Sequence, residues 1–328
     1  MSADPQKDEL LNVSGMSVRY SGAFGDVFAV NGVSFEMGRS EIFSLVGESG
    51  CGKSTTAHAI ARLLNEKQAS ITGKIIFDGQ NLLDLRWKQM TEYRGRRIGM
   101  IFQNPLDSLN PLWTAGYQIG EAIALDKLIA SEILSETESL FKEVMIPDPR
   151  KRMSSYPHEL SGGMRQRVMI AMMLSRHPDL LIADEPTTSL DVTIQSQILD
   201  LLSELRETHG TSILLITHDF GIVASMADRV GVMYAGRLVE IGDVESIFES
   251  PIHPYTRKLM QALPNIPKGE QRLGVIPGTV PDMSYPIPGC AFMKRCGEAS
   301  GVCAEWDGRM IDCGAGRLAS CAMIGKSH

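Results

Sequence analysis

Residues 41–56 read Glu-Ile-Phe-Ser-Leu-Val-Gly-Glu-Ser-Gly-Cys-Gly-Lys-Ser-Thr-Thr, and this stretch decides the fold. The apolar run from Ile42 to Val46 predicts a buried strand, and residues 55–64 predict a helix. Between them lies a G-x-x-x-x-G-K-S sequence, which in a strand-loop-helix context indicates a phosphate-binding loop. A glycine-rich turn that binds nothing is the alternative, and the agreement of loop, lysine, hydroxyl and flanking elements disfavours it.

The residue types in the loop suit a nucleoside triphosphate. Gly47, Gly50 and Gly52 let the backbone curl so that its N–H groups and the helix N-terminus face the phosphates. Lys53 is expected to reach the β and γ phosphates, and the Ser54 hydroxyl to ligate Mg²⁺. The core should therefore be an α/β fold of the P-loop NTPase type.

Composition narrows the class of protein. Of the 328 residues, 43% are hydrophobic, and no apolar run approaches the roughly 20 residues that span a bilayer. The polar, acidic start does not resemble a secretory signal, so we expect a cytoplasmic protein. The formal net charge of −7 without a Lys/Arg-rich tract argues against nucleic-acid binding.

Segments on either side of the loop predict the rest of the core. Short alternating stretches in residues 10–40 predict antiparallel strands. Tyr20 ends one of them, and its ring could stack on an adenine base or lie on an ordinary strand edge. Residues 231–240 predict a β-hairpin around Ala235 and Gly236.

Two further strands and a helical insert are expected in the middle of the chain. Ile71–Phe77 and Ile98–Phe102 have strand character, and Lys88–Arg97 predicts a mostly helical connection between them. The second strand ends at Gln103. A helix-rich block follows to about residue 177, which predicts a helical subdomain over about 104–178.

Polar residues follow or precede apolar runs at three further places in the chain. One place predicts a second anion site, and the other two predict the edge of the sheet. Ser161, Gly162 and Gly163 precede an apolar helix, with Ser161 as its N-cap, although such a turn is often only a cap. The apolar run 180–183 predicts a buried strand with two acidic residues at its end. Asp184 is expected to bind Mg²⁺, and Glu185 to polarise a water. A further apolar run ends at His218, which could orient that water or be an ordinary strand end.

These motifs, in this order, resemble the ATP-binding subunit of an ABC transporter over residues 10 to about 245. The resemblance identifies a Walker A loop, a Q-loop glutamine, a signature, a Walker B strand with its catalytic acid, a D-loop and a switch histidine. It implies ATP contacts from Tyr20, Gly47, Ser49, Gly50, Cys51, Gly52, Lys53, Ser54, Thr55, Ser161, Gly162, Gly163 and Asp191, with Ser54, Gln103 and Asp184 on Mg²⁺ and Glu185, His218 and Gln103 in catalysis.

The tail resembles the C-terminal extension of the dipeptide, oligopeptide and nickel importer subfamily. Residues 250–256, 276–278 and 288–296 carry this likeness, so we expect an ATPase domain over 1–249 and an extension over 250–328. The resemblance implies an ATPase that pairs with a second ATPase subunit at the cytoplasmic face of the membrane. The pair would lie beneath two permease subunits fed by an extracytoplasmic binding protein, and peptides are the expected cargo.

The implied mechanism needs a dimer, in which Ser161–Gly163 of one subunit caps the γ phosphate bound by the other. The stretch from Gln103 to Pro111 is expected to act as the hinge toward the membrane subunits. Nickel or another small solute is an alternative cargo. A soluble ABC ATPase outside transport and a P-loop kinase or GTPase are alternative classes, the latter disfavoured by the signature.

Five of the six cysteines follow residue 289, which in a reducing compartment points to metal or cluster ligation. The segment is loop-rich and has little apolar periodicity with which to build a core. We expect Cys290, Cys296, Cys303 and Cys321 to hold a [4Fe-4S] cluster, since the resemblance covers their spacing and fits Cys321 better than Cys313. Zinc ligation and free thiols are the alternatives.

Overall fold

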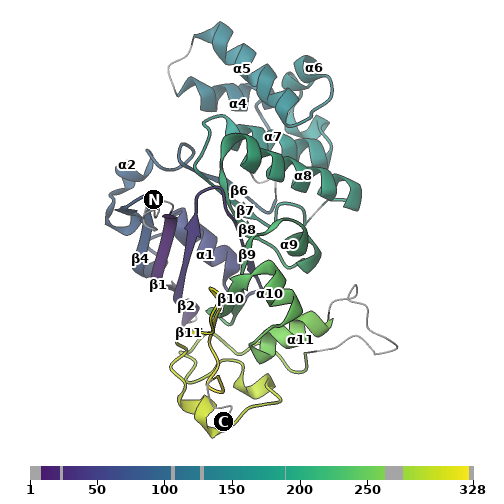
Figure 1. The fold of residues 1–328 in the computed structure, drawn as a ribbon. Helices are drawn as coiled ribbons and strands as arrows, with labels where there is room; N and C mark the ends of the chain where they lie inside the picture. Colours follow the sequence, from purple (N-terminus) through teal and green to yellow (C-terminus); the bar gives the residue numbers. More distant parts are fainter. Residues whose placement is uncertain are drawn as a thin grey trace, which may run out of the picture. The chain divides into compact units, whose positions relative to one another are not determined.

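The computed structural model describes residues 9–22, 25–104, 108–125, 129–188, 190–262 and 276–324 (Figure 1). The chain divides into two compact units. Unit 1 comprises residues 1–38, 42–84 and 216–328, and unit 2 comprises residues 39–41 and 85–215. Part of the expected Gln103–Pro111 hinge, and Ser189 of the expected D-loop (residues 189–191), lie outside the described residues.

Unit 1 contains an antiparallel sheet in the order β2-β1-β4-β5. Its strands are β1 (Glu9–Gly22), β2 (Gly25–Gly38), β4 (Ala69–Phe77) and β5 (Gln80–Asn81). Strands β1 and β2 pair in antiparallel register, for example Val13 with Phe35 and Tyr20 with Val27. The alternating segments before the loop were therefore correctly predicted as antiparallel strands.

The second sheet of unit 1 carries the phosphate-binding loop. Its neighbouring strands follow the order β11-β12-β10-β9-β3, and β3 runs parallel to β9. The elements are β3 (Ile42–Val46), α1 (Lys53–Ile60), η2 (Leu82–Asp84), α9 (Phe220–Met226), β9 (Arg229–Tyr234), β10 (Arg237–Asp243), α10 (Val244–Glu249), α11 (Pro254–Ala262), η4 (Met293–Arg295), η5 (Gly301–Glu305), β11 (Ile311–Asp312) and β12 (Leu318–Ala319). All five residues of β3 are buried, as its apolar sequence predicts.

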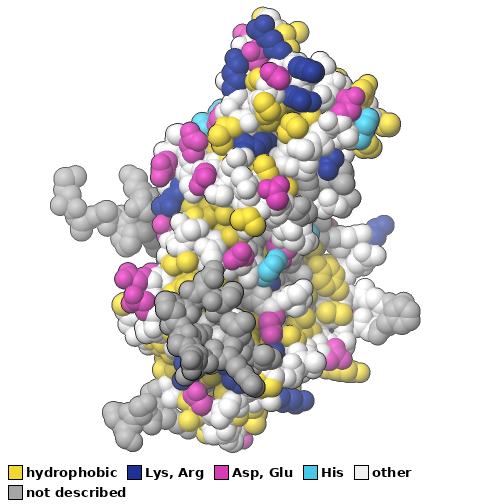
Figure 2. All heavy atoms as spheres, turned by 90° about the vertical axis from the view of Figure 1, so that its right-hand side faces the viewer, with side chains coloured by type: hydrophobic (Ala, Val, Ile, Leu, Met, Phe, Trp, Pro, Cys, Tyr) yellow, Lys and Arg dark blue, Asp and Glu magenta, His cyan; other side chains and the backbone are white. Residues whose placement is uncertain are grey.

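Unit 2 combines strands with the predicted helical block. It contains α2 (Trp87–Met90), β6 (Ile98–Ile101), α4 (Ala115–Ala124), α5 (Ala130–Glu143), α6 (Pro149–Met153), η3 (Pro157–Glu159), α7 (Gly162–Leu174), β7 (Leu180–Asp184), α8 (Val192–His209) and β8 (Ser212–Ile216). Strands β6 and β7 are parallel. Helix α6 has three consecutive basic residues, and Figure 2 shows Lys and Arg side chains, in dark blue, gathered over the helices at the top of the view.

One local prediction was wrong, and two short strands were not predicted. The connection Lys88–Arg97 is helical only within α2. Turns come after this helix, and Arg94 forms an isolated bridge with Ile98. Glycine at position 95 has a φ of +68°, a conformation that interrupts a helix. Strands β11 and β12 were not predicted, because two residues each are too short to show an alternating pattern.

The described residues of the tail join the core of unit 1. Phe292 is fully buried and packs with Tyr234 and Tyr255. Strand β12 pairs with β10, which extends the sheet. The low apolar periodicity of the tail is therefore consistent with a segment that completes another core.

A buried carboxylate fastens this segment to β10. Glu240 is completely buried and accepts hydrogen bonds from the backbone N–H groups of Ile252 and His253, both at 2.8 Å. The guanidinium of Arg317 lies 3.3 Å from the same carboxylate. Burial of a charge is tolerated only with such partners, because an unpaired buried charge is costly.

Replacement of Glu240 by Ala should lower the free energy of unfolding by roughly 3–5 kcal/mol, since it leaves two N–H groups without their acceptor and Arg317 without its ion-pair partner. The measurement is urea unfolding followed by circular dichroism. The exposed Glu249 supplies the control, and Glu249→Ala should change the midpoint little. Equal midpoints for the two variants would contradict this assignment.

Candidate functional site

The phosphate-binding loop connects β3 to α1 in unit 1 and passes close to other strands. A Cβ on Gly47, whose φ is +151°, would collide with the carbonyl oxygen of Met233 in β9. A Cβ on Gly52, at φ +104°, would lie 2.5 Å from the carbonyl oxygen of Ala29 in β2. Both positions therefore require glycine on steric grounds as well as conformational ones.

Lys53 begins α1 and is held over the loop. Its side chain is buried, and Nζ donates to the carbonyl oxygens of Gly47 at 2.8 Å and Glu48 at 3.1 Å. The next residue, Ser54, is exposed, as are Ser49 and Gly50, while Thr55 is half-buried. The loop thus combines an anchored ammonium with accessible backbone and hydroxyl groups, as a triphosphate with a cation would require.

Cys51 is fully buried within the loop, and its Sγ lies 3.7 Å from Lys53 Nζ. Burial raises the pKa of the thiol, although the neighbouring ammonium opposes this effect. The thiol is therefore held neutral and acts as a packing group.

Glu48 has partners that the sequence did not reveal. Its carboxylate forms a two-pronged ion pair with Arg295, at 2.7 and 3.0 Å, and its N–H donates to the Tyr255 hydroxyl at 3.1 Å. The hydrogen bond to Glu48 raises the pKa of Arg295 above its ordinary value. Arg295 and Tyr255 lie in the tail, among the residues that carry the family likeness. The sequence around them does not indicate that they contact Glu48.

Two other predicted site residues lie in unit 1. Tyr20 is half-buried on β1, where it pairs with Val27 and Ala69. His218 is exposed and follows β8. The predicted contacts of Tyr20 with a base and of His218 with a phosphate stay predictions.

The predicted acidic residues lie at the end of β7 in unit 2. Asp184 is buried and Glu185 follows it, with a backbone φ of +48° directly before Pro186. Such a conformation costs a non-glycine residue roughly 1–3 kcal/mol and is typical of functional positions. Glu185 Oε2 accepts hydrogen bonds from Gln103 Nε2 at 2.7 Å and from Thr188 Oγ1 at 2.8 Å. The structure thus brings together Gln103 and Glu185, two of the predicted catalytic residues.

The signature residues begin helix α7. The Ser161 hydroxyl accepts a hydrogen bond from the Met164 N–H at 3.3 Å, which confirms the predicted N-cap. A Cβ on Gly163 would lie 2.6 Å from Ile194 Cγ2, so helix α8 packs tightly against this turn. Asp191 is itself the N-cap of α8, accepting from the Ile194 N–H at 3.0 Å.

Three of the tail cysteines, Cys290, Cys296 and Cys321, have a raised pKa, mainly because they are buried. Burial is the main cause that raises the pKa of Cys290, and Cys303, Cys321 and Cys296 add to it. Burial also raises the pKa of Cys313, but the groups that act on it are Ala319, Arg317, Glu240 and Asp312 and not the other cysteines. Within the described ranges, no group of three or more His, Cys, Asp or Glu side chains is arranged as a metal site. The thiols of the predicted set are thus neighbours without forming a coordination sphere in this structure.

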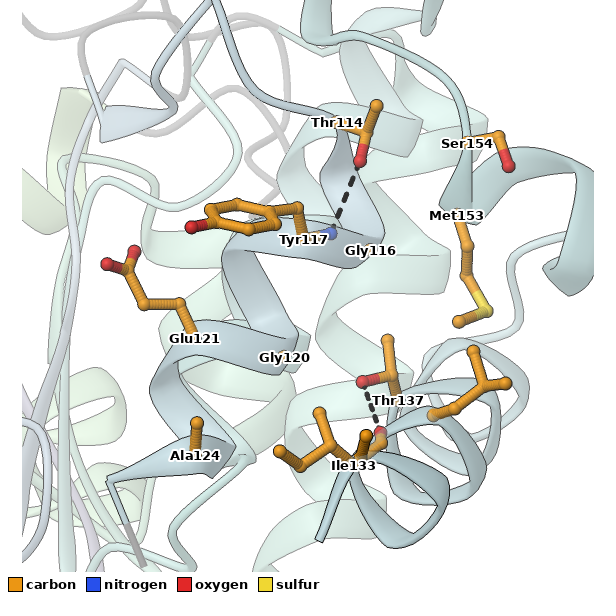
Figure 3. Close-up of a pocket in the computed structure, with 12 residues that line it drawn as sticks. Thr114, Gly116, Tyr117, Gly120, Glu121, Ala124, Ile133, Thr137, Met153 and Ser154 are labelled. Carbon is orange, nitrogen blue, oxygen red and sulfur yellow. Dashed lines mark hydrogen bonds between the residues drawn. The ribbon is translucent and has the colours of Figure 1, made fainter. Parts of the chain in front are cut away.

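A groove lies between α4 and α5 in unit 2 (Figure 3). It has a volume of about 590 Å³. Figure 3 shows Tyr117 and Glu121 on α4, Ile133 and Thr137 on α5, and Met153 beside them. The groove is mostly apolar and has exposed walls, because Tyr117 is 56% and Leu134 is 62% exposed.

None of the helices in the described part of the chain is both long and apolar enough to cross a membrane.

Two family models match the chain in succession. The ABC transporter model matches residues 30–188. The model of the oligopeptide/dipeptide transporter C-terminal region matches residues 239–303. Both the loop and most of the cysteine-bearing tail therefore fall within matched regions.

Curated relatives match nearly the full chain. A peptide ABC transporter ATP-binding protein of Sinorhizobium fredii is 48% identical over 98% of this chain and 97% of its own length. The dipeptide transport ATP-binding protein DppD of Bacillus subtilis is 47% identical over 90% of this chain and 89% of its own. The oligopeptide transport ATP-binding protein OppD of Escherichia coli is 44% identical over 92% and 90%.

Solved structures agree with the relatives. A dimeric ATP-binding cassette in a post-hydrolysis state, bound to ADP and Pi, is 25% identical with a TM-score of 0.65 and covers 72% of this chain and 99% of that one. The cbiO1 protein of Clostridium perfringens is 30% identical with a TM-score of 0.63, covering 74% and 92%. The chain therefore belongs to the ATP-binding proteins of ABC transporters, in the branch with the oligopeptide/dipeptide transporter C-terminal region.

Proposed function

We propose that the protein is the ATP-hydrolysing subunit that powers import of dipeptides or oligopeptides. The observation that carries this proposal is the joint presence, in one chain, of the phosphate-binding loop with its anchored Lys53 and of a tail matching the oligopeptide/dipeptide transporter C-terminal region. The relatives are named for dipeptide and oligopeptide transport, which favours peptides over nickel as cargo.

The described side chains support a division of labour in hydrolysis. The loop amides and Lys53 would bind the phosphates, and Ser54, Gln103 and Asp184 offer the hydroxyl, amide and carboxylate oxygens that Mg²⁺ prefers. Mg²⁺ would supply neutralisation of phosphate charge. Glu185, aimed by Gln103 and Thr188, would take the proton from the attacking water.

Pairing would complete the site. Ser161, Gly162 and Gly163 present a capped helix N-terminus, which suits the γ phosphate of ATP bound to a second ATPase subunit. The dimeric cassette among the similar structures supports such a pair. His218 would orient the water, Tyr20 would stack on the adenine, and Asp191 would fix the turn beside the partner's nucleotide.

The groove of unit 2 is the surface that we assign to the membrane subunits. Its occupant would be a short amphipathic helix of a permease, because the walls are apolar and exposed while Glu121 offers a charge at one side. Two permease subunits, supplied by an extracytoplasmic binding protein, would hold the ATPase pair at the cytoplasmic face of the membrane.

We also propose that Cys290, Cys296, Cys303 and Cys321 hold a [4Fe-4S] cluster with a structural role. Four thiolates are the donor set of such a cluster. Three observations support this choice. Neighbouring cysteines add to the raised pKa of Cys290, Cys296 and Cys321, whereas none of them is among the groups that act on Cys313. The Cys290 N–H also donates to the Cys303 carbonyl at 2.8 Å.

Replacement of Glu185 by Gln should lower ATP turnover by about 10²–10⁴-fold while ATP binding is retained, because it removes the proton acceptor alone. The measurement is phosphate release by the assembled transporter, with the partner ATPase site also blocked. The exposed Glu207 gives a matched control, and Glu207→Gln should leave turnover unchanged. Normal turnover in the Glu185 variant would refute its role.

Replacement of Leu134 by Glu should reduce co-purification with the co-expressed permease subunits by at least about tenfold, because it places a charge in an apolar contact. Leu63 is also exposed but lies in unit 1, outside the groove, so Leu63→Glu is the control. Retention of the Leu134 variant at the wild-type level would exclude the groove as the docking surface.

Protein purified without oxygen should be brown, with broad absorbance near roughly 400 nm and stoichiometric iron. Cys303→Ser should remove the colour, whereas Cys313→Ser should keep it, since Cys313 lies apart from the other four. Colourless protein with bound zinc would refute the cluster and leave the ATPase assignment intact.

A further inference from the structure

Glu48, the second residue of the phosphate-binding loop, is held by three groups at once. Its N–H donates to the Tyr255 hydroxyl at 3.1 Å, and its carbonyl oxygen accepts from Lys53 Nζ at 3.1 Å. Its carboxylate pairs with both terminal nitrogens of Arg295, at 2.7 and 3.0 Å. Two of these three partners come from the tail, so the tail contributes directly to the conformation of the loop.

Arg295 is itself rigidly placed. Its side chain is 6% exposed, against 26% for Glu48. The guanidinium also donates to the carbonyl oxygens of Pro277 at 3.0 Å and Ile276 at 3.2 Å. A guanidinium with several fixed acceptors presents a planar fork that cannot follow a moving carboxylate. Arg295 therefore restrains Glu48 rather than accompanying it.

An aromatic cluster supports both tail groups. The rings of Tyr234 and Tyr255 lie 4.6 Å apart, and Phe292 packs against both at 5.2 and 5.3 Å. The Tyr234 hydroxyl lies 3.3 Å from an Arg295 nitrogen. Lys258 Nζ donates to the Arg295 carbonyl at 2.7 Å, which fixes the backbone of the same turn.

We propose that Arg295 and Tyr255 are positioning residues that order the phosphate-binding loop before ATP arrives, so that the tail sets the affinity for ATP. The loop binds phosphates through backbone N–H groups, whose directions depend on the backbone at Glu48. A loop without these restraints must be ordered during binding, which weakens affinity but leaves the chemical step unchanged. This inference rests on the proposed role of the loop as the ATP site.

The test compares MgATP affinity of the full chain by calorimetry with kcat of the assembled transporter at saturating ATP. Arg295→Ala should raise the Kd for MgATP by about 5- to 150-fold, the range of a typical coupling between sites, with kcat within about twofold of wild type. Tyr255→Phe should raise the Kd in the same direction. Glu48→Gln and Arg295→Ala disrupt the same ion pair. The double variant should therefore bind MgATP no more weakly than whichever single variant has the higher Kd.

Arg317 provides the matched control, since it fastens the same tail through Glu240 and Ser250. Arg317→Ala should keep the wild-type Kd. An equal rise in Kd for Arg317→Ala, or a wild-type Kd for Arg295→Ala, would overturn the inference. If Arg295→Ala does not fold, Arg295→Lys and Glu48→Gln decide, and wild-type affinity in both would overturn it.

Lys53→Ala separates this inference from the proposed function. Retained MgATP binding in Lys53→Ala would show that the loop is not the ATP site, and both proposals would fail. Lost binding in Lys53→Ala together with unchanged binding in Arg295→Ala would overturn only the role of the tail.

Discussion

The closeness of the phosphate-binding loop to two neighbouring strands is the constraint on which the rest of unit 1 depends. Gly47 passes against the backbone of β9 and Gly52 against the backbone of β2, so that neither position has room for a side chain. The turn between β9 and β10 closes this arrangement, because the Gly236 N–H donates to the Cys51 carbonyl at 2.9 Å. The curvature of the loop is therefore imposed by strand packing as well as by its own sequence.

Local sequence predicted an element where its residues alone, such as an apolar run or a capping residue, indicate the structure. The apolar runs predicted β3 with the bounds that the structure shows and β7 to within one residue, because fully buried parallel strands are apolar along their length. The Ser-Gly-Gly turn predicted the cap of α7, since a hydroxyl before a helix satisfies an unpaired N–H. Helix α1 differed at both ends, because it runs from Lys53 to Ile60 and not over residues 55–64.

Interactions between distant segments could not be predicted in this way. Arg295 and Glu48 are 247 residues apart, and the sequence around one does not predict contact with the other. The same applies to the hydrogen bond between Glu185 and Gln103, whose residues were each predicted from a strand end while their contact was not. Periodicity reports which face of an element is buried, but pairing depends on the fold that brings two elements together.

The pairing of Glu48 with Arg295 has a consequence for biosynthesis. Glu48 leaves the ribosome early, and its carboxylate has no ion-pair partner from the tail until Arg295 has been made. At about 5–20 residues per second, roughly 12–50 s separate the two residues during translation. Contacts of such long sequence separation also form late, because closing the intervening loop is entropically unfavourable. The predicted phosphate-binding loop is thus among the first segments to be synthesised, and its ion pair with the tail forms only after Arg295 has been made and has reached Glu48.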